Sequence, residues 1–269
     1  MEKRIHFNQY LAIVISFLFT LTGVYAQKTD EKFTPYSGQS GKDVVWVPTP
    51  QTLVDTMLAI AKVTSADYVI DLGSGDGRLV ISAAKRGATA LGIEYNPDMV
   101  ELARRAAKEE GVSAKATFRQ ADIFESDFSQ ATVITLFLLS DLNLKLRPVI
   151  LNMKPGTRIV SNTFGMSDWE PDLTVRLNEG SSWTTAHLWI VPAQVKGAWN
   201  FDGGQINFTQ EFQNISGILT VGGKETPLFG KLDGDKINFK AGGTEYNGTV
   251  SGNAISGTIT GGGSWKATR

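Results

Sequence analysis

Short apolar runs and stretches of helical periodicity alternate along residues 44–164. The apolar runs have strand length, and they predict strands over residues 67–72, 90–95, 116–122, 131–139 and 157–164. Between these runs, apolar residues recur at helical spacing, which predicts helices over residues 50–63, 78–86, 96–111 and 143–153. Strands that alternate with helices predict a parallel sheet with helices on both faces. The continuous apolar run at 131–139 predicts a strand that is buried on both sides.

Two of the predicted helices begin at residues suited to a helix start. Thr49 before Pro50, and Asn96 before Pro97, are typical of an N-cap followed by proline at the first helical position. Gly87 marks the end of the second helix. These signals favour helices over loops in the segments between the strands.

The pattern changes after residue 171. Residues 173–179 and 185–193 predict two neighbouring strands with no helix between them, and from about residue 195 the chain consists of short alternating strands and glycine turns. Sixteen of the 28 glycines lie in 195–269, and turn signals recur every 8–12 residues there. We therefore predict a first α/β domain over 44–194 and a second domain over 195–269, an antiparallel β-meander that forms a small barrel or sandwich.

The N-terminus has the pattern of an export signal. Lys3 and Arg4 precede an apolar run at 11–24, and Val24-Tyr25-Ala26 offers small residues at a cleavage site. The run is 14 residues long, short of the ~20 that span a bilayer. We predict a signal peptide over 1–26, a polar linker over 27–43, and a protein located in the periplasm, envelope or exterior of the cell.

Composition excludes several kinds of site. The chain has no cysteine and two histidines, which excludes disulfides, thiolate catalysis and multi-histidine metal sites, so no metal site is predicted. The formal net charge of -1 gives no reason to expect nucleic acid as the main partner, because nucleic-acid binding usually needs a basic excess.

The glycine-rich stretch "DLGSGDG" at 71–77 is the first candidate site. It lacks the Lys-Ser/Thr pair of a P-loop, and Arg78 occupies the slot where a dinucleotide fingerprint has its third glycine. Asp71 and Asp76 flank the loop, and two unit charges 4 Å apart interact with roughly 4 kcal/mol at an effective dielectric of 20. That electrostatic field disfavours a pyrophosphate and favours a cation. We therefore predict S-adenosylmethionine, which carries a sulfonium and an ammonium group, as the cofactor.

Two further acids extend this site. Glu94 ends the second predicted strand, where a carboxylate accepts hydrogen bonds from ribose hydroxyls. Asp122 ends the third, where it can meet the adenine amino group while Ile123 or Phe124 covers a ring face. Three acids at successive strand ends meet at one edge of a parallel sheet, the edge at which such sheets bind their ligands.

With these motifs the sequence resembles the class I S-adenosylmethionine-dependent methyltransferases over roughly 44–193. The resemblance is carried by "VPTP" (47–50), "DLGSGDGRLV" (71–80), "GIEYNPDMVELAR" (92–104), "QADIF" (120–124) and "KPGTRIVSNTF" (154–164). Within the class it is similar to small protein-lysine methyltransferases that modify the ATP synthase c-subunit and the adenine nucleotide translocase, and more distantly to Dot1-type enzymes. The resemblance implies a seven-stranded Rossmann-like sheet whose last strand is antiparallel. It also implies a protein substrate, which we expect to be associated with the membrane or envelope. The predicted cofactor residues are Thr49, Asp71, Gly73, Ser74, Gly75, Asp76, Gly77, Glu94, Asp122 and Ile123.

Methyl transfer to nitrogen is helped mainly by alignment and the removal of water, so a carboxylate, amide or carbonyl that orients the amine suffices. The candidates beyond the fourth and fifth strands are Asp141, Asn143, Asp168 and Trp169, each of which could instead be a helix cap or a packing residue. His187 lies in a predicted apolar strand. This position is typical of a structural histidine in the core, whose ring nitrogens are hydrogen-bonded, and not of a catalytic base. The sequence lacks the N-P-P-Y motif expected of enzymes that methylate amide or adenine amino groups, which disfavours these substrates.

Three hypotheses for the whole protein remain open at this stage. The first is an active methyltransferase that modifies a nitrogen nucleophile, a protein lysine above all. The second is an exported protein that binds the nucleoside without transferring a methyl group. The third places the function in the C-terminal β-domain as an envelope-interaction module. The intact acids Asp71, Glu94 and Asp122 favour the first hypothesis.

Overall fold

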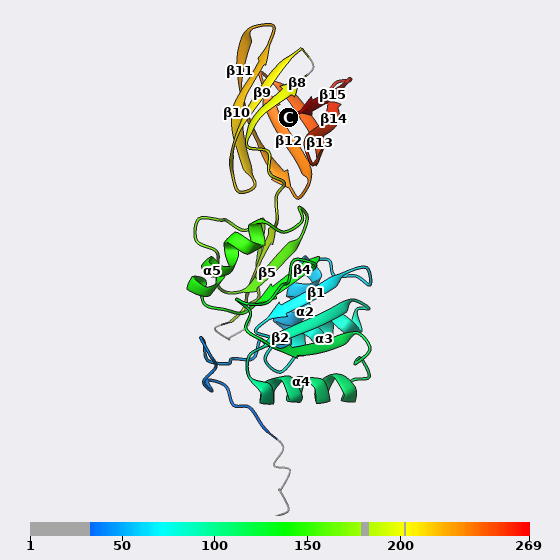
Figure 1. Cartoon of the computed structure of the whole chain (residues 1–269), viewed down its shortest axis with the longest axis vertical. Coiled ribbons are helices and arrows are strands. Elements are labelled where there is room, and N and C mark those ends of the chain that lie inside the picture. Colours follow the sequence, from blue (N-terminus) through cyan, green and yellow to red (C-terminus); the bar gives the residue numbers. More distant parts are fainter. Residues whose placement is uncertain (1–32, 179–182, 202) are drawn as a thin grey trace, which may run out of the picture. The chain divides into compact units, whose positions relative to one another are not determined.

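The computed structural model describes residues 33–178, 183–201 and 203–269, so the predicted signal peptide at 1–26 lies outside the described residues. Residues 68–190 build a seven-stranded sheet with the strand order β3-β2-β1-β4-β5-β7-β6 (Figure 1). Its strands are β1 Tyr68–Leu72, β2 Thr89–Glu94, β3 Ala116–Gln120, β4 Val133–Leu136, β5 Arg158–Asn162, β6 Leu173–Arg176 and β7 Thr185–Ile190. Strands β1 to β5 pair in parallel and β7 is antiparallel to both of its neighbours, as predicted.

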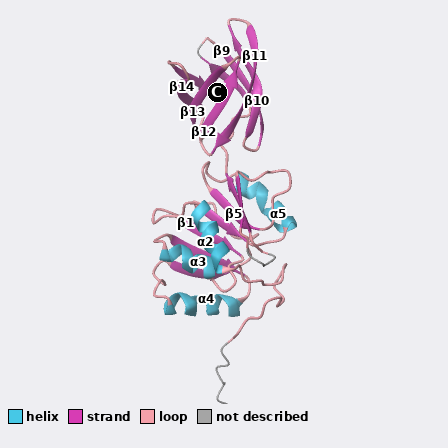
Figure 2. Cartoon of the chain, turned by 180° about the vertical axis from the view of Figure 1, so that it is seen from behind, coloured by secondary structure: helices cyan, strands magenta, loops and turns pink. Residues whose placement is uncertain are grey.

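Four described helices accompany this sheet, namely α2 Gln51–Ile60, α3 Arg78–Lys85, α4 Pro97–Glu109 and α5 Ser140–Leu151 (Figure 2). Asn96 caps α4 as predicted, because its side-chain oxygen accepts from the amides of Asp98 (2.9 Å) and Met99 (3.4 Å). The prediction that Thr49 caps α2 is wrong. Pro50 occupies the N-cap position, and the Thr49 hydroxyl instead accepts a hydrogen bond from Asn162 Nδ2 at 3.2 Å.

Apolar side chains form one core on each face of the sheet. Helices α2, α3 and α4 supply one core, and α5 supplies the other together with buried Trp169 and Trp189. All four residues of β4 are buried, as the continuous apolar run predicted, although the strand is shorter than that run. The two cores place the loops at the carboxyl ends of β1, β2 and β4 on a rigid base.

Residues 197–268 close into an eight-stranded barrel, so the predicted β-meander is a barrel (Figure 2). Its strands are β8 Gly197–Phe201, β9 Gly204–Glu211, β10 Asn214–Val221, β11 Lys224–Asp233, β12 Lys236–Ala241, β13 Thr244–Ser251, β14 Ala254–Ile259 and β15 Ser264–Thr268. Its centre is filled by aromatic rings, and Phe239 stacks on Tyr246 with ring centroids 4.7 Å apart. Side chains therefore fill this small barrel, as expected for eight strands.

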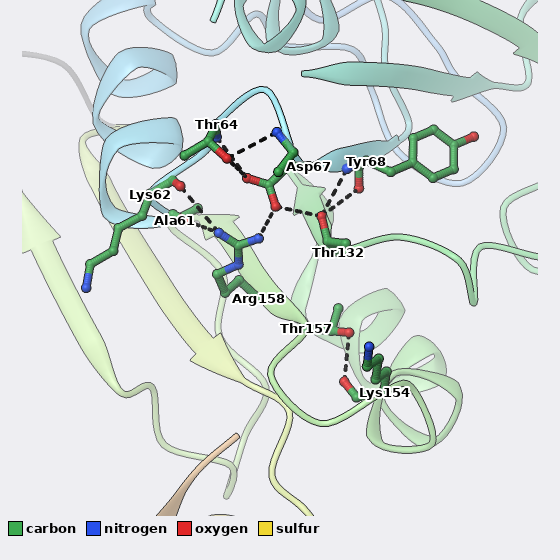
Figure 3. A network of polar contacts seen from close by, with 10 residues as sticks. Ala61, Lys62, Thr64, Asp67, Tyr68, Thr132, Lys154, Thr157 and Arg158 are labelled. Atoms are coloured by element: carbon green, nitrogen blue, oxygen red, sulfur yellow. Dashed lines mark hydrogen bonds and ion pairs between the residues drawn. The ribbon is translucent and has the colours of Figure 1, made fainter. Parts of the chain in front are cut away.

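The amino ends of the parallel strands are joined by a polar network around Asp67 (Figure 3). Asp67 is 8% exposed and forms an ion pair with Arg158, the first residue of β5. It also accepts hydrogen bonds from Thr132 Oγ1 at 2.8 Å and from the amide of Thr64 at 2.8 Å. The network ties β1, β4 and β5 together at the edge opposite the predicted cofactor residues.

Within the described residues, the structure contains no helix that is both long and apolar enough to cross a bilayer. Nor do these residues include a group of three or more His, Asp or Glu side chains arranged to hold a metal ion.

Candidate functional site

A pocket opens at the carboxyl ends of β1, β2 and β4, and the three predicted acids lie along this edge. Asp71 lies within β1, Glu94 is the last residue of β2, and Asp122 follows β3 by two residues. All three line the pocket, together with the predicted residues Thr49, Gly73, Ser74, Asp76 and Ile123. The parallel pairing of β1, β2 and β3 brings the acids together although they are far apart in the chain.

The glycine loop adopts the backbone conformation that its residues favour. Gly73, Gly75 and Gly77 have φ angles of +83°, +53° and +82°. The loop is anchored by amide hydrogen bonds from Gly73 and Ser74 to the carbonyl of Ile93, at 2.9 and 3.1 Å. A Cβ at Gly77 would lie 2.7 Å from the Phe118 ring, so Gly77 is the glycine that allows α3 to pack closely against β3 and α4.

Asp76 forms an ion pair with Arg78, which was not predicted from the sequence. Arg78 Nε contacts both carboxylate oxygens of Asp76 at 3.0 Å, and its Nη1 donates to the carbonyl of Thr49 at 2.7 Å. The charge of Asp76 is therefore largely neutralised by Arg78. The carboxylates left to attract a cation are those of Asp71 and Glu94, and Arg78 joins the glycine loop to the segment before α2.

Among the acids of the pocket, Asp71 has the most strongly shifted pKa. It is 3% exposed and accepts one hydrogen bond, from Thr135 Oγ1 at 2.6 Å. Burial raises the pKa of Asp71 to about 7, Thr135 opposes this rise, and the neighbouring charges of Glu94 and Asp76 add to it. A bound cation would favour the ionised form of this carboxyl.

Glu94 has a positioning role within the loops. One of its oxygens accepts from the amide of Gly75 and the other from the amide of Asn96, both at 2.9 Å. These bonds fix the glycine loop against the start of α4. A carboxylate oxygen has two lone-pair sites, so each oxygen retains acceptor capacity toward a hydroxyl group.

Asp122 has a partner that the sequence did not indicate. The ammonium group of Lys42 forms an ion pair with the carboxylate of Asp122 and donates a hydrogen bond to it. This hydrogen bond lowers the pKa of Asp122. Lys42 belongs to a hairpin over residues 38–46, in which the Gly38 amide donates to the carbonyl of Trp46 at 2.8 Å and the Trp46 amide donates to the carbonyl of Gln39 at 2.9 Å. Residues 39–49 line the pocket, although 27–43 were predicted as a linker. Gly38 and Gly41 before the apolar residues 44–47 are the signal that could have predicted this turn.

The four predicted catalytic residues lie outside the residues that line this pocket. Asp141 is exposed in the first turn of α5, and Asp168 forms an ion pair with Arg147. Trp169 is fully buried and donates from its indole nitrogen to Gln213 Oε1 at 2.9 Å. Asn143 is also buried, and its amide nitrogen donates to the carbonyls of Phe164 (3.2 Å) and Gly165 (3.3 Å). Among the described residues that line the pocket, none of these four is present, whereas Phe137, Leu138 and Leu142 are.

His187 has both ring nitrogens occupied. Thr174 Oγ1 lies 2.9 Å from Nδ1, and the carbonyl of Thr163 lies 3.2 Å from Nε2. Burial lowers the pKa of His187. This is the arrangement of a structural histidine, in agreement with its interpretation from the sequence.

Comparison with known proteins shows the family. The model of the ANTKMT methyltransferase domain matches residues 71–173. A protein-lysine N-methyltransferase of Saccharolobus islandicus is 40% identical over 151 residues, which cover 55% of this chain and 94% of that protein. The chain belongs to the S-adenosylmethionine-dependent methyltransferase family that includes this lysine methyltransferase. The ATP synthase c-subunit lysine N-methyltransferase of Homo sapiens is 32% identical over 156 residues, which cover 57% of this chain and 64% of the human enzyme.

A solved structure supports the same assignment. An RNA methyltransferase from Salinibacter ruber in complex with S-adenosyl-L-homocysteine is 48% identical, with a TM-score of 0.53 over 55% of this chain and 96% of that one. The enzyme described here is thus a methyltransferase, and its cofactor is S-adenosylmethionine. The names of these relatives differ in substrate, since one acts on RNA and the others on lysine.

The pocket residues fit this cofactor. Asp71 and Glu94 offer negative charge and hydrogen-bond acceptors, which suit an ammonium group, a sulfonium and ribose hydroxyls. Ile123, Leu138 and Met99 supply apolar surface for a flat base. Among the described residues of the lining, Arg78 and Lys42 are the cationic side chains, and they are paired with Asp76 and Asp122, so the pocket offers little to a phosphate.

Proposed function

We propose that this methyltransferase modifies the side-chain amine of a protein lysine. The observation that carries the proposal is the match to the Saccharolobus islandicus lysine methyltransferase, which extends over 94% of that protein. The aligned region therefore spans nearly the whole of that enzyme. The human relative, which modifies lysine in the ATP synthase c-subunit, supports the same substrate class.

Charge favours protein over RNA as the substrate. RNA binding draws on an excess of clustered Lys and Arg, and this chain has 26 Lys and Arg in total against 27 Asp and Glu. Near the pocket, Lys42 is paired with Asp122 and Arg78 is paired with Asp76. The RNA methyltransferase of Salinibacter ruber nevertheless makes RNA methylation a second outcome to test.

The chain's own residues would support the reaction by positioning and by excluding water. When bound, S-adenosylmethionine supplies a methyl group on sulfonium: the amine lone pair forms the C–N bond while the C–S bond breaks and its electrons stay on sulfur. Asp71 and Glu94 would hold the cationic and hydroxyl groups, and the 38–46 hairpin would keep water from the pocket. The incoming lysine releases its proton to solvent before the transfer, because only the neutral amine has a lone pair that can form the C–N bond.

The experiment is a labelling assay with the full chain and methyl-labelled S-adenosylmethionine, offered envelope proteins, cytosolic proteins or RNA. We expect label in protein that protease removes and ribonuclease leaves, with methyl-lysine recovered after acid hydrolysis. The Asp71→Asn variant, which keeps the size of the side chain, serves as the control and should lose most of the label. Label in RNA alone, or binding of cofactor without label in either polymer, would refute the proposal.

We also propose that the protein is exported, with an envelope or membrane-associated protein as its substrate. The basis is the basic start and the 14-residue apolar run at 11–24. A phosphatase that is active only outside the cytosol, fused after residue 30, should be active. A variant with Ile15→Lys and Leu18→Lys should abolish that activity because charge interrupts the apolar run. Equal activity in both fusions would refute export.

A further inference from the structure

Three aromatic rings form a continuous wall beside the cofactor pocket. Phe137 follows β4, Phe164 follows β5, and Trp183 precedes β7, and these three strands are neighbours in the sheet. The ring centroids of Phe137 and Phe164 are 6.2 Å apart, and Trp183 lies 5.5 Å from Phe137 and 5.7 Å from Phe164. All three side chains are partly exposed. Core aromatics of this domain, such as Trp169 and Trp189, are by contrast fully buried.

The wall starts inside the pocket and continues outward. Phe137 lines the pocket, whereas Phe164 and Trp183 do not. The carboxyl edge of the sheet is therefore divided in two. The acids Asp71, Glu94 and Asp122 lie at β1, β2 and β3, on one side, and the aromatic wall lies at β4, β5 and β7, on the other.

The backbone that carries Phe164 is held in a costly conformation. Thr163 has a φ of +63°, which is rare for a β-branched residue and unfavourable. The carbonyl of Phe164 accepts from Ser161 Oγ at 2.7 Å and from Asn143 Nδ2 at 3.2 Å. These buried donors keep the strained turn in place. Asn143, predicted as catalytic, thus has the geometry of a positioning residue that acts through Phe164.

We propose that Phe137, Phe164 and Trp183 form the acceptor subsite, where the side chain of the substrate lysine lies against their exposed faces. The inference rests on the proposed lysine methylation and assigns it a binding surface. Aromatic faces bind both the methylene stem of a lysine and its cationic head, the latter through cation–π attraction. The wall lies on the side of the pocket away from the acids, so an acceptor can approach without displacing the nucleoside from them.

The test measures binding in addition to activity. The full chain, saturated with S-adenosyl-L-homocysteine, is titrated with the amide of Nε-trimethyllysine and with its neutral isostere, in which carbon replaces the charged nitrogen. We expect the cationic probe to bind about tenfold more tightly than the isostere, the size of a favourable cation–π contact. Phe164→Ala and Trp183→Ala should each weaken the cationic probe about tenfold, and Trp183→Phe should retain most of the affinity.

Two controls separate a specific effect from misfolding. The affinity for S-adenosyl-L-homocysteine should be the same in all variants, because neither Phe164 nor Trp183 lines the cofactor pocket. Phe229→Ala removes a ring that is 69% exposed on the barrel and should change nothing. Asn143→Ala should weaken the cationic probe while leaving its preference over the isostere intact, as expected for a residue that acts through Phe164.

The outcomes distinguish this inference from the function on which it rests. If methyl-lysine forms and the wall variants leave probe affinity and acceptor KM unchanged, the subsite is wrong and lysine methylation stands. If RNA is labelled and a nucleoside monophosphate binds the wall in place of the lysine probe, both are wrong. Equal affinity for the cationic probe and its isostere overturns the cation–π basis of the subsite.

Discussion

Lys42 forms an ion pair with Asp122, 80 positions further along the chain, and its ammonium lies 5.1 Å from the centroid of the Tyr95 ring. This contact fastens the 38–46 hairpin to the loops after β2 and β3. The Gln39 amide nitrogen adds a contact with the sulfur of Met99 at 3.5 Å. The hairpin thus lies over the pocket, held by the Lys42–Asp122 pair at the surface and by the buried contact between Gln39 and Met99.

The first prediction concerns Lys42→Gln. Loss of the charge should loosen the hairpin and speed exchange of the Gly38 and Trp46 amides, whose hydrogen bonds close it. Cofactor should dissociate several-fold faster, while the melting temperature stays nearly constant because the pair is exposed. Hydrogen exchange with mass spectrometry and stopped-flow fluorescence measure the two effects. Lys85→Gln, which breaks an exposed pair with Glu110, is the control; equal hairpin exchange in the two variants would show that Lys42 does not hold the hairpin.

The second prediction concerns Gly75→Ala. A Cβ at Gly75 would lie 2.5 Å from Trp46 Nε1, and the φ of +53° is unfavourable for alanine. We expect the indole of Trp46 to be displaced and cofactor affinity to fall more than about tenfold, measured by calorimetry. Gly111→Ala is the matched control, since Gly111 has a φ of +69° and open space around it. It should lower stability by about 1 kcal/mol and leave cofactor binding unchanged; a similar loss of affinity in both variants would assign the effect to general strain.

The acid side of the site could be predicted from the sequence because strand ends are marked by short-range signals. Buried apolar runs place Asp71, Glu94 and Asp122 at the carboxyl ends of parallel strands, and parallel pairing brings those ends to one edge.

The pairing of charges and the acceptor side could not be predicted in this way. Whether Asp76 meets Arg78 or a ligand depends on the rotamer of Arg78, which the carbonyl of Thr49 also holds. Whether Lys42 reaches Asp122 depends on how distant loops fold over one another. The same holds for Phe137, Phe164 and Trp183, which no sequence spacing connects. Asp168 and Trp169 follow β5 in the sequence, but the turn there directs Trp169 into the core and Asp168 toward Arg147.

The third prediction is a pH dependence of cofactor binding through Asp71. Its pKa of about 7 means that it is mostly protonated at pH 6 in the free enzyme. A cationic ligand needs the ionised form, so affinity should rise about eightfold between pH 6 and pH 7.5. Calorimetry in buffers of different ionisation enthalpy should also detect a released proton. In Asp71→Asn the affinity should be low and independent of pH across this range; a pH-dependent profile in that variant would place the titrating group elsewhere.

The fourth prediction is that Asp67→Asn destabilises the fold. Asp67 is 8% exposed, and its loss leaves the guanidinium of Arg158 without its anionic partner at the amino ends of β1 and β5 (Figure 3). We expect a cost of about 2 kcal/mol in urea unfolding. Arg158→Met alone should also destabilise, and the double variant should recover part of the loss because no unpaired charge remains. Strictly additive costs would show that the two residues do not interact.

The fifth prediction is that Asp67 and Asp71 give the cofactor-free protein opposite pH dependences in separate windows. Burial acts to raise the pKa of Asp67, but hydrogen bonds from Thr64, Arg158 and Thr132 hold it below the usual value. Its stabilising effect is therefore present above about pH 4 and lost as the pH falls through its lower native-state pKa. The pKa of Asp71 is raised to about 7, so its contribution is present below about pH 4 and is lost as the pH rises toward 7. The melting temperature should thus rise up to about pH 4 and fall toward pH 7. Asp67→Asn should reduce the rise, to which Asp122, Asp127 and Asp168 also contribute because their pKa values are lowered by their hydrogen bonds. Asp71→Asn should remove the fall, so a fall that persists in that variant would refute this assignment.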